Sequence, residues 1–78
     1  MNNYGRTHVL RILDEHGDTH LEFDPEKTTE LRDVEERFEE LMRRGFVAFD
    51  VSTQPGRIIK TFDPNATETI VSPRFAGG

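Results

Sequence analysis

Two glycines, Gly77 and Gly78, end the sequence, and they are the residues whose type and spacing point most directly to chemistry. Because glycine makes up ~7% of residues on average, a pair at that place arises by chance in roughly 0.5% of chains. The chemistry that uses such an end is carboxylate activation, in which an ATP-dependent enzyme adenylates the carboxylate and passes the acyl group to a thiol or sulfide. Glycine has no Cβ atom, so the tail can thread a narrow channel in an extended conformation. The plainer interpretation is a flexible terminus or a tail that docks on a partner.

The remaining residues offer little for catalysis by the chain itself. There is no cysteine, which excludes disulfides, thiolate zinc sites, iron–sulfur clusters and cysteine nucleophiles. A nucleophile would have to be Ser52, Ser72 or a threonine, and no histidine with an acid is spaced to activate one. A domain of 78 residues also lacks the bulk to enclose a substrate cleft. We therefore expect that the protein is not an enzyme.

Three histidines raise the question of a metal site, because imidazole is a common metal ligand. If His16 and Gly17 form the centre of a turn, Leu13 faces His20 across a hairpin. His8 then lies about five residues further along the strand, or ~17 Å away, which is too far for one ion. We expect neither a metal ion nor another cofactor.

The overall charge narrows the classes of partner. The formal net charge is −5 and charged residues make up 32% of the chain, whereas a nucleic-acid-binding domain usually carries a basic face. No apolar run approaches the ~20 residues that a membrane span needs. Residues 1–5 are polar and unlike a signal peptide, so a cytoplasmic protein with protein partners is expected.

A β-hairpin is predicted at the start of the chain. Residues 7–13 carry large apolar side chains on both faces, which is typical of a strand in the middle of a sheet. Residues 19–23 alternate, with Leu21 and Phe23 facing one way. Residues 14–18 between them form the turn.

Residues 25–44 are predicted to form a single helix. Asp24 is expected as its N-cap, Pro25 at its first position and Gly45 just after its end. The apolar residues of the segment recur at helical spacing and make one stripe: Leu31, Val34, Phe38, Leu41 and Met42. Opposite charges four residues apart are expected to pair on the solvated surface, as Asp33–Arg37, Glu39–Arg43 and Glu40–Arg44.

Three more strands are predicted after the helix, at residues 46–51, 57–62 and 69–72. Pro55 and Gly56 mark the loop between the first two. Asp63 is expected to cap a short turn before the last one. Residues 73–78 are predicted to leave the sheet as a tail, because proline lacks the N–H donor that a central strand needs.

These elements predict a two-layer α+β domain of four to five strands, since a helix with one apolar stripe must bury it on a sheet. Residues 1–78 then form one domain, with an arm at 1–5, a core at 6–72 and the tail. In one arrangement the last strand lies beside the first and parallel to it, and in the other the sheet is antiparallel with the last strand at an edge. The apolar first strand favours the mixed sheet. The predicted core brings the helix residues Leu31, Val34, Phe38 and Leu41 against Leu10, Ile12, Leu21, Phe49 and Ile59.

The order of elements, the length, the single helix and the tail Arg74-Phe75-Ala76-Gly77-Gly78 resemble the ubiquitin-like β-grasp modifiers and sulfur carriers. The resemblance covers the whole chain in topology but only Gly77-Gly78, with Arg74 ahead of them, in motif. It implies a β-grasp-like ββαββ(β) fold and a conjugation tail formed by Arg74, Phe75, Ala76, Gly77 and Gly78. The implied partners are an adenylating enzyme and a conjugation target.

The sequence departs from that family at two points. Gly45 and Phe46 join the helix directly to the next strand, whereas the family usually separates the two elements. Lys27 and Lys60 are the only lysines, so polymeric chains are not expected. The sequence also loosely resembles small uncharacterised bacterial and phage-encoded proteins with a Phe-Asp-Pro segment and a Gly-Gly end. The alternative function is a non-catalytic interaction or structural module, for example a subunit of a phage or multiprotein assembly. A modifier requires Gly78, whereas such a module tolerates its removal or extension.

Overall fold

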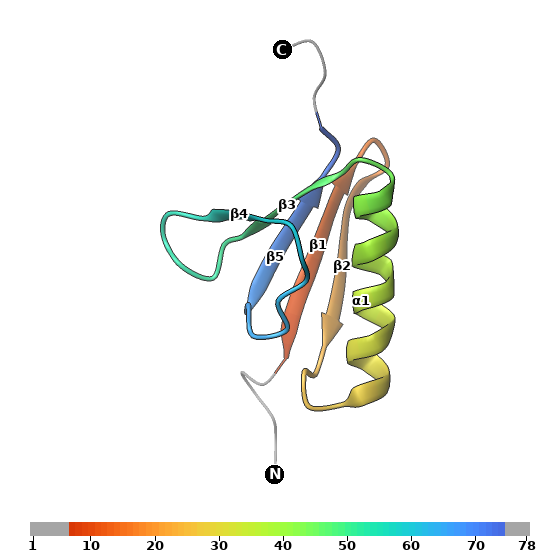
Figure 1. Ribbon diagram of the computed structural model, residues 1–78, viewed down its shortest axis with the longest axis vertical. Helices are drawn as coiled ribbons and strands as arrows, with labels where there is room; N and C mark the ends of the chain where they lie inside the picture. The colour runs from red at the N-terminus through yellow and green to blue at the C-terminus, as the bar shows by residue number, and fades with distance from the viewer. Residues whose placement is uncertain (1–6, 75–78) are drawn as a thin grey trace.

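The computed structural model describes residues 7–74, which form one helix packed on one face of a five-stranded mixed sheet (Figure 1). The elements along the chain are β1 (His8–Asp14), β2 (Gly17–Phe23), α1 (Thr28–Arg43), β3 (Val47–Asp50), β4 (Arg57–Ile59) and β5 (Glu68–Ser72). The strand order is β2-β1-β5-β3-β4, in which β1 and β5 are parallel and the other neighbours antiparallel. The predicted α+β class and the mixed sheet are confirmed, and the antiparallel alternative is wrong. The predicted arm at 1–5 lies outside the described residues.

The first hairpin is tighter than predicted. Asp14 pairs with Gly17 and Leu13 pairs with Asp18, which leaves only two residues in the turn. Gly17 has a φ of 117°, a backbone conformation that glycine adopts without strain, so β2 can begin directly after the turn. The expected pairing of Leu13 with His20 is therefore wrong.

The helix begins at Thr28, later than the sequence predicts, because Asp24 caps a turn and not the helix. The Asp24 carboxylate accepts a hydrogen bond from the backbone N–H of Glu26 (2.9 Å), and its carbonyl accepts one from Lys27 (2.9 Å). Lys27 precedes the helix with an extended backbone and no side-chain cap. Glu30 in the first helical turn accepts a hydrogen bond from the backbone N–H of Asp24 (2.9 Å), which ties the helix to the end of β2.

The end of the helix agrees with the prediction. Gly45 has a φ of 93° and donates its backbone N–H to the carbonyl of Met42 (3.0 Å), while Phe46 donates to Leu41 (3.1 Å). This pair of bonds is a Schellman motif, which satisfies the last helical carbonyls and reverses the chain. β3 consequently starts at Val47, only two residues after Gly45.

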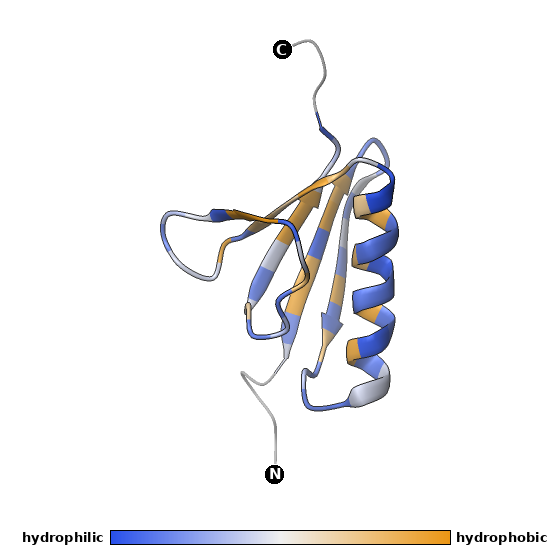
Figure 2. Cartoon of the chain, viewed as in Figure 1, coloured by the Kyte–Doolittle hydropathy of each residue, from blue (hydrophilic) through white to orange (hydrophobic). Residues whose placement is uncertain are grey.

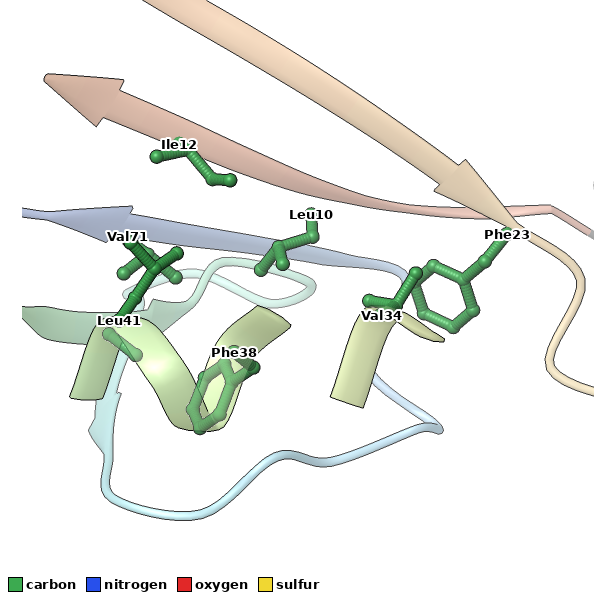
Figure 3. Close-up of a cluster of buried hydrophobic side chains, with 8 residues drawn as sticks. Leu10, Ile12, Phe23, Val34, Phe38, Leu41 and Val71 are labelled. Atoms are coloured by element: carbon green, nitrogen blue, oxygen red, sulfur yellow. The ribbon is translucent and has the colours of Figure 1, made fainter. Parts of the chain in front are cut away.

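The core lies between α1 and the sheet, where the apolar side of the helix faces the strands (Figure 2). Val34, Phe38 and Leu41 supply the buried side chains of the helix, and Leu31 is half-buried. Figure 3 shows several of these side chains converging, and the cluster comprises Leu10, Ile12, Phe23, Val34, Phe38, Leu41, Ala48 and Val71. Leu21 and Ile59 pack at its margin, as predicted.

Phe49 is not part of this core, in contrast to the prediction. In β3 the buried positions are Ala48 and Asp50, so the alternation of a strand places Phe49 on the opposite face. Phe49 pairs there with Ile58 and Ile70. The sequence favoured the larger apolar residue for the core, whereas the register of the sheet selects the smaller one.

Candidate functional site

The predicted tail starts at the centre of the sheet. β5 lies between β1 and β3 and ends at Ser72, after which Pro73 is half-buried and Arg74 is exposed. The structure therefore places Arg74, the first residue of the predicted conjugation tail, in solvent just beyond the end of β5. The other four residues, Phe75, Ala76, Gly77 and Gly78, lie outside the described residues.

The surroundings of Pro73 are formed by the first hairpin and the end of the helix. Because β1 and β5 are parallel, their carboxyl ends lie at the same edge of the sheet, as Figure 1 shows. A hollow of about 420 Å³ on one side of Pro73 is lined by Leu13 and the acidic start of the β1–β2 turn. A second hollow of about 280 Å³ is lined by that turn together with Arg44 and Phe46. The Arg44 guanidinium lies 5.5 Å from the centre of the Phe46 ring, so this side of the exit combines one cation with the carboxylates of Asp14 and Glu15.

The face of the sheet away from α1 carries an apolar row that is not among the residues predicted from the sequence. Ile70 pairs with Phe49 and Phe49 pairs with Ile58, so their side chains share one face on three neighbouring strands. Ile58 is 65% exposed, whereas Phe49 and Ile70 are half-buried. We call Phe49, Ile58 and Ile70 the open-face row. Its signal in the sequence is the uninterrupted apolar run at residues 46–49, which places apolar side chains at both alternating positions of the strand.

Arg11 bounds the open-face row on the β1 side. It pairs with Ile70, and its guanidinium donates hydrogen bonds to Asp18 on β2 (3.0 Å) and Glu68 on β5 (3.0 Å). The hydrogen bond from Arg11 holds the pKa of Asp18 below its ordinary value, and the bonds to Asp18 and Glu68 raise the pKa of Arg11. Three strands are thereby linked by one charged group, which separates the apolar row from the polar surface of β2.

His8 and His20 lie on opposite faces of the hairpin, and His16 lies in its turn. The ring of His8 lies with Nδ1 2.9 Å from the carbonyl of Pro64, on the side of α1. His20 pairs with Arg11 on the open face, and its Nε2 lies 3.2 Å from Asp18. In residues 7–74, no three histidine or acidic side chains gather in a way that would hold a metal ion.

The two serines considered as nucleophiles bind backbone groups. The Ser52 hydroxyl oxygen accepts hydrogen bonds from the backbone N–H groups of Thr67 (2.8 Å) and Glu68 (3.4 Å). The Ser72 hydroxyl donates to the carbonyl of Pro73 (3.1 Å). Ser52 thus joins the β3–β4 loop to the start of β5, and Ser72 lies at the exit of the tail.

The charged surface of α1 differs from the predicted pattern. Ion pairs form between residues three apart, Arg37–Glu40 (3.4 Å) and Lys27–Glu30 (3.8 Å). Along the described part of the helix, none of the expected pairs four residues apart, Asp33–Arg37, Glu39–Arg43 and Glu40–Arg44, is closed. The exposed side of the helix therefore presents several charges that are not neutralised by a neighbour.

The chain matches no family model, no curated protein and no solved structure. Among residues 7–74 we find no helical segment with the length and apolar character that a bilayer crossing requires.

Proposed function

We propose that this chain is a ubiquitin-like β-grasp protein that acts through the carboxylate of Gly78, as a covalent modifier or a sulfur carrier, after ATP-dependent adenylation. The observation that carries the proposal is the position of β5, which lies at the centre of the sheet parallel to β1 and runs directly into the tail. One helix packed on a five-stranded mixed sheet, with the last strand beside the first, supports the β-grasp-like fold that we propose. Adenylation needs ATP, so the proposed location is the cytoplasm.

The chemistry proceeds on the tail and not within the domain. The Gly78 carboxylate attacks the α-phosphate of ATP, which forms an acyl-adenylate and releases pyrophosphate. A thiol of the activating enzyme displaces AMP to give a thioester, and an amine of the target displaces that thiol to give an amide. For a sulfur carrier, a sulfide displaces AMP and leaves a thiocarboxylate at Gly78. In both routes the folded domain provides the surface that partners bind while the tail reacts.

The open-face row is suited to that role because β5 carries both the row and the tail. Ile70 precedes Arg74 by four residues, or ~13 Å in extended chain. A partner that packs on Ile58, Phe49 and Ile70 therefore has Arg74 within reach. An acidic group on such a partner would pair with the exposed guanidinium of Arg74.

The test compares N-terminally tagged proteins expressed in the cells from which the sequence comes. The unaltered chain should give adducts that survive denaturing purification, and deletion of Gly78 should abolish them. Ile58→Ser should weaken adduct formation by several-fold without unfolding the domain, because this side chain is largely exposed. Thr53→Ala, a substitution at an exposed loop position, is the matched control and should leave the adducts unchanged. Adducts that persist after Gly78 deletion would contradict the proposal.

The open-face row also favours a second candidate, a non-catalytic interaction module such as a subunit of a phage or multiprotein assembly. An exposed isoleucine that continues a row formed by Phe49 and Ile70 is the kind of apolar surface that a partner covers. Under this second function, Ile58→Ser removes partner binding, whereas deletion of Gly78 has no effect. The two variants thus separate the two candidates.

A further inference from the structure

A groove of about 430 Å³ lies between α1 and the segment that follows β4. Its floor is apolar and consists of Phe38, Met42 and Phe62, with the rings of Phe38 and Phe62 5.5 Å apart between centres. Phe38 is fully buried, whereas Met42 and Phe62 are half-buried and so present apolar surface to the groove. Because methionine is flexible and polarisable, the floor can adapt to an inserted side chain.

The rim of the groove is charged and has two distinct ends. Glu35 and Glu39 lie on the helix on one side of Met42, and Arg43 lies on the helix beyond it, with Lys60 on the facing wall. All four side chains are exposed, and none of them forms an ion pair with another residue of the described chain. Glu35 and Arg43 are eight residues apart on the helix, which corresponds to ~12 Å.

We propose that this groove binds the tail of a second copy of the chain. The tail offers the complementary groups in the required order: a cation at Arg74, an aromatic ring at Phe75 and, in a chain that ends at Gly78, a carboxylate. In an extended tail the first and last of these are four residues, or ~13 Å, apart. The spacing matches the distance along α1 from Glu35 to Arg43, with Phe75 set over the apolar floor.

Docking of this kind joins one face of a molecule to the tail of the next, so the contact is heterologous and can continue along a row of molecules. A tail held in the groove is not free to enter an activating enzyme. Docking itself needs neither ATP nor an enzyme, so its outcome is independent of whether Gly78 is ever adenylated.

The first test uses the isotopically labelled full chain and a synthetic peptide of residues 72–78. Addition of the peptide should shift the NMR signals of α1 from Glu35 to Arg43 and of Lys60–Phe62, and leave the signals of β1 and β2 in place. A peptide with Phe75→Ala should bind at least tenfold more weakly. Absence of saturable shifts in the groove, or equal binding of the two peptides, would overturn the proposal.

The second test exchanges charges between the two partners. A peptide with Arg74→Glu should bind at least fivefold more weakly to the unaltered chain, and the double variant Glu35→Lys, Glu39→Lys should restore its binding. All three positions are exposed, so the folded domain should tolerate the exchange. Failure of the exchange to restore binding would count against the assigned orientation and hence against the site.

Dilution of the full chain distinguishes a second copy from the chain's own tail. The signals of the groove should move toward those of a chain lacking residues 75–78 as the protein is diluted. Groove signals that respond to removal of the tail but not to dilution would mean that the tail binds within its own molecule, and this result would overturn the proposal of a second copy.

Discussion

At the scale of single residues, Phe38 connects the layers of this small domain. It is 1% exposed, and its ring lies 5.5 Å from that of Phe62, which in turn lies 5.8 Å from that of Phe23. The chain of rings joins the helix to the end of β2 and to the segment after β4. A small domain buries only about 60% of the surface of its unfolded chain, so the loss of one such side chain removes a large part of its stability.

The substitution Phe38→Ala should therefore lower the free energy of unfolding by ~3–5 kcal/mol, since it removes the transfer free energy of the ring and leaves a cavity. Chemical denaturation measures this change. Glu36→Ala, at an exposed position of the same helix, is the control and should change the free energy little. An unfolding midpoint for Phe38→Ala equal to that of Glu36→Ala would refute the packing.

Asp50 is the buried carboxylate of the sheet, with 6% of its surface exposed. The Ser52 hydroxyl and backbone N–H, followed by the guanidinium of Arg57 at 3.4 Å, hold its pKa below the ordinary value of 3.8. Because the pKa of Asp50 is lower in the folded state, its charge stabilises the fold fully above the ordinary pKa. This stabilisation is lost as the pH falls through the lower pKa of the folded state.

The variant Asp50→Asn tests this linkage. It should have a lower thermal midpoint than the unaltered chain at pH 7, because its neutral amide accepts weaker hydrogen bonds from Ser52 and pairs less strongly with Arg57. The difference between the two midpoints should shrink as the pH is lowered from about 4 toward 2. A difference that stays constant over that interval would show that the charge of Asp50 does not stabilise the fold.

At the scale of secondary-structure elements, the sequence predicts the centres of the elements better than their ends. The helical stripe and the two-residue alternation of the strands arise from burial on one face, so periodicity locates α1 and all five strands in order. The predicted beginning of α1 was wrong because Asp24-Pro25 is equally compatible with a turn and with a helix cap. The hydrogen bond from the backbone N–H of Glu26 to the Asp24 carboxylate distinguishes the turn from the cap. The predicted face of Phe49 was wrong because it depends on the register of β3 with β5, which is a contact between distant segments of the chain.

Gly45 is the residue on which the direct connection from α1 to β3 depends. Apart from Gly45 and its chain neighbours, no atom of residues 7–74 lies within 4 Å of a Cβ built at this position, so a substitution is opposed by the φ of 93° and not by a clash. Gly45→Ala should therefore cost about 1–2 kcal/mol, the penalty of a left-handed conformation for a residue with a Cβ atom. Gly45→Asn should cost less, because asparagine tolerates this conformation better.

Thermal unfolding of the two Gly45 variants gives the comparison. If Gly45→Ala were as stable as the unaltered chain, the turn would not require a positive φ. Equal losses in the alanine and asparagine variants would point to a lost contact and not to the backbone.

At the scale of the whole molecule, the tail and the surfaces that serve it were predictable to different degrees. Gly77 and Gly78 stand out in the sequence by type alone. The open-face row, in contrast, combines side chains from β3, β4 and β5, and it exists only because Phe49 stands between Ile58 and Ile70 in the register. The groove likewise joins α1 to the segment after β4, so no local pattern reveals it.

The most direct measurement of the central claim is mass spectrometry of the tail after purification of the protein from its own cells. Because trypsin cleaves after Arg74, a target modified through Gly78 should retain residues Phe75 to Gly78 as a branch on a lysine. A sulfur carrier should instead yield a tail peptide whose mass exceeds that of the carboxylate by the difference between a sulfur and an oxygen atom. The account predicts one of these two products, each absent from the protein that lacks Gly78. A Gly78 carboxylate found only in its free form, in cells where the protein is bound to its partners, would contradict the account.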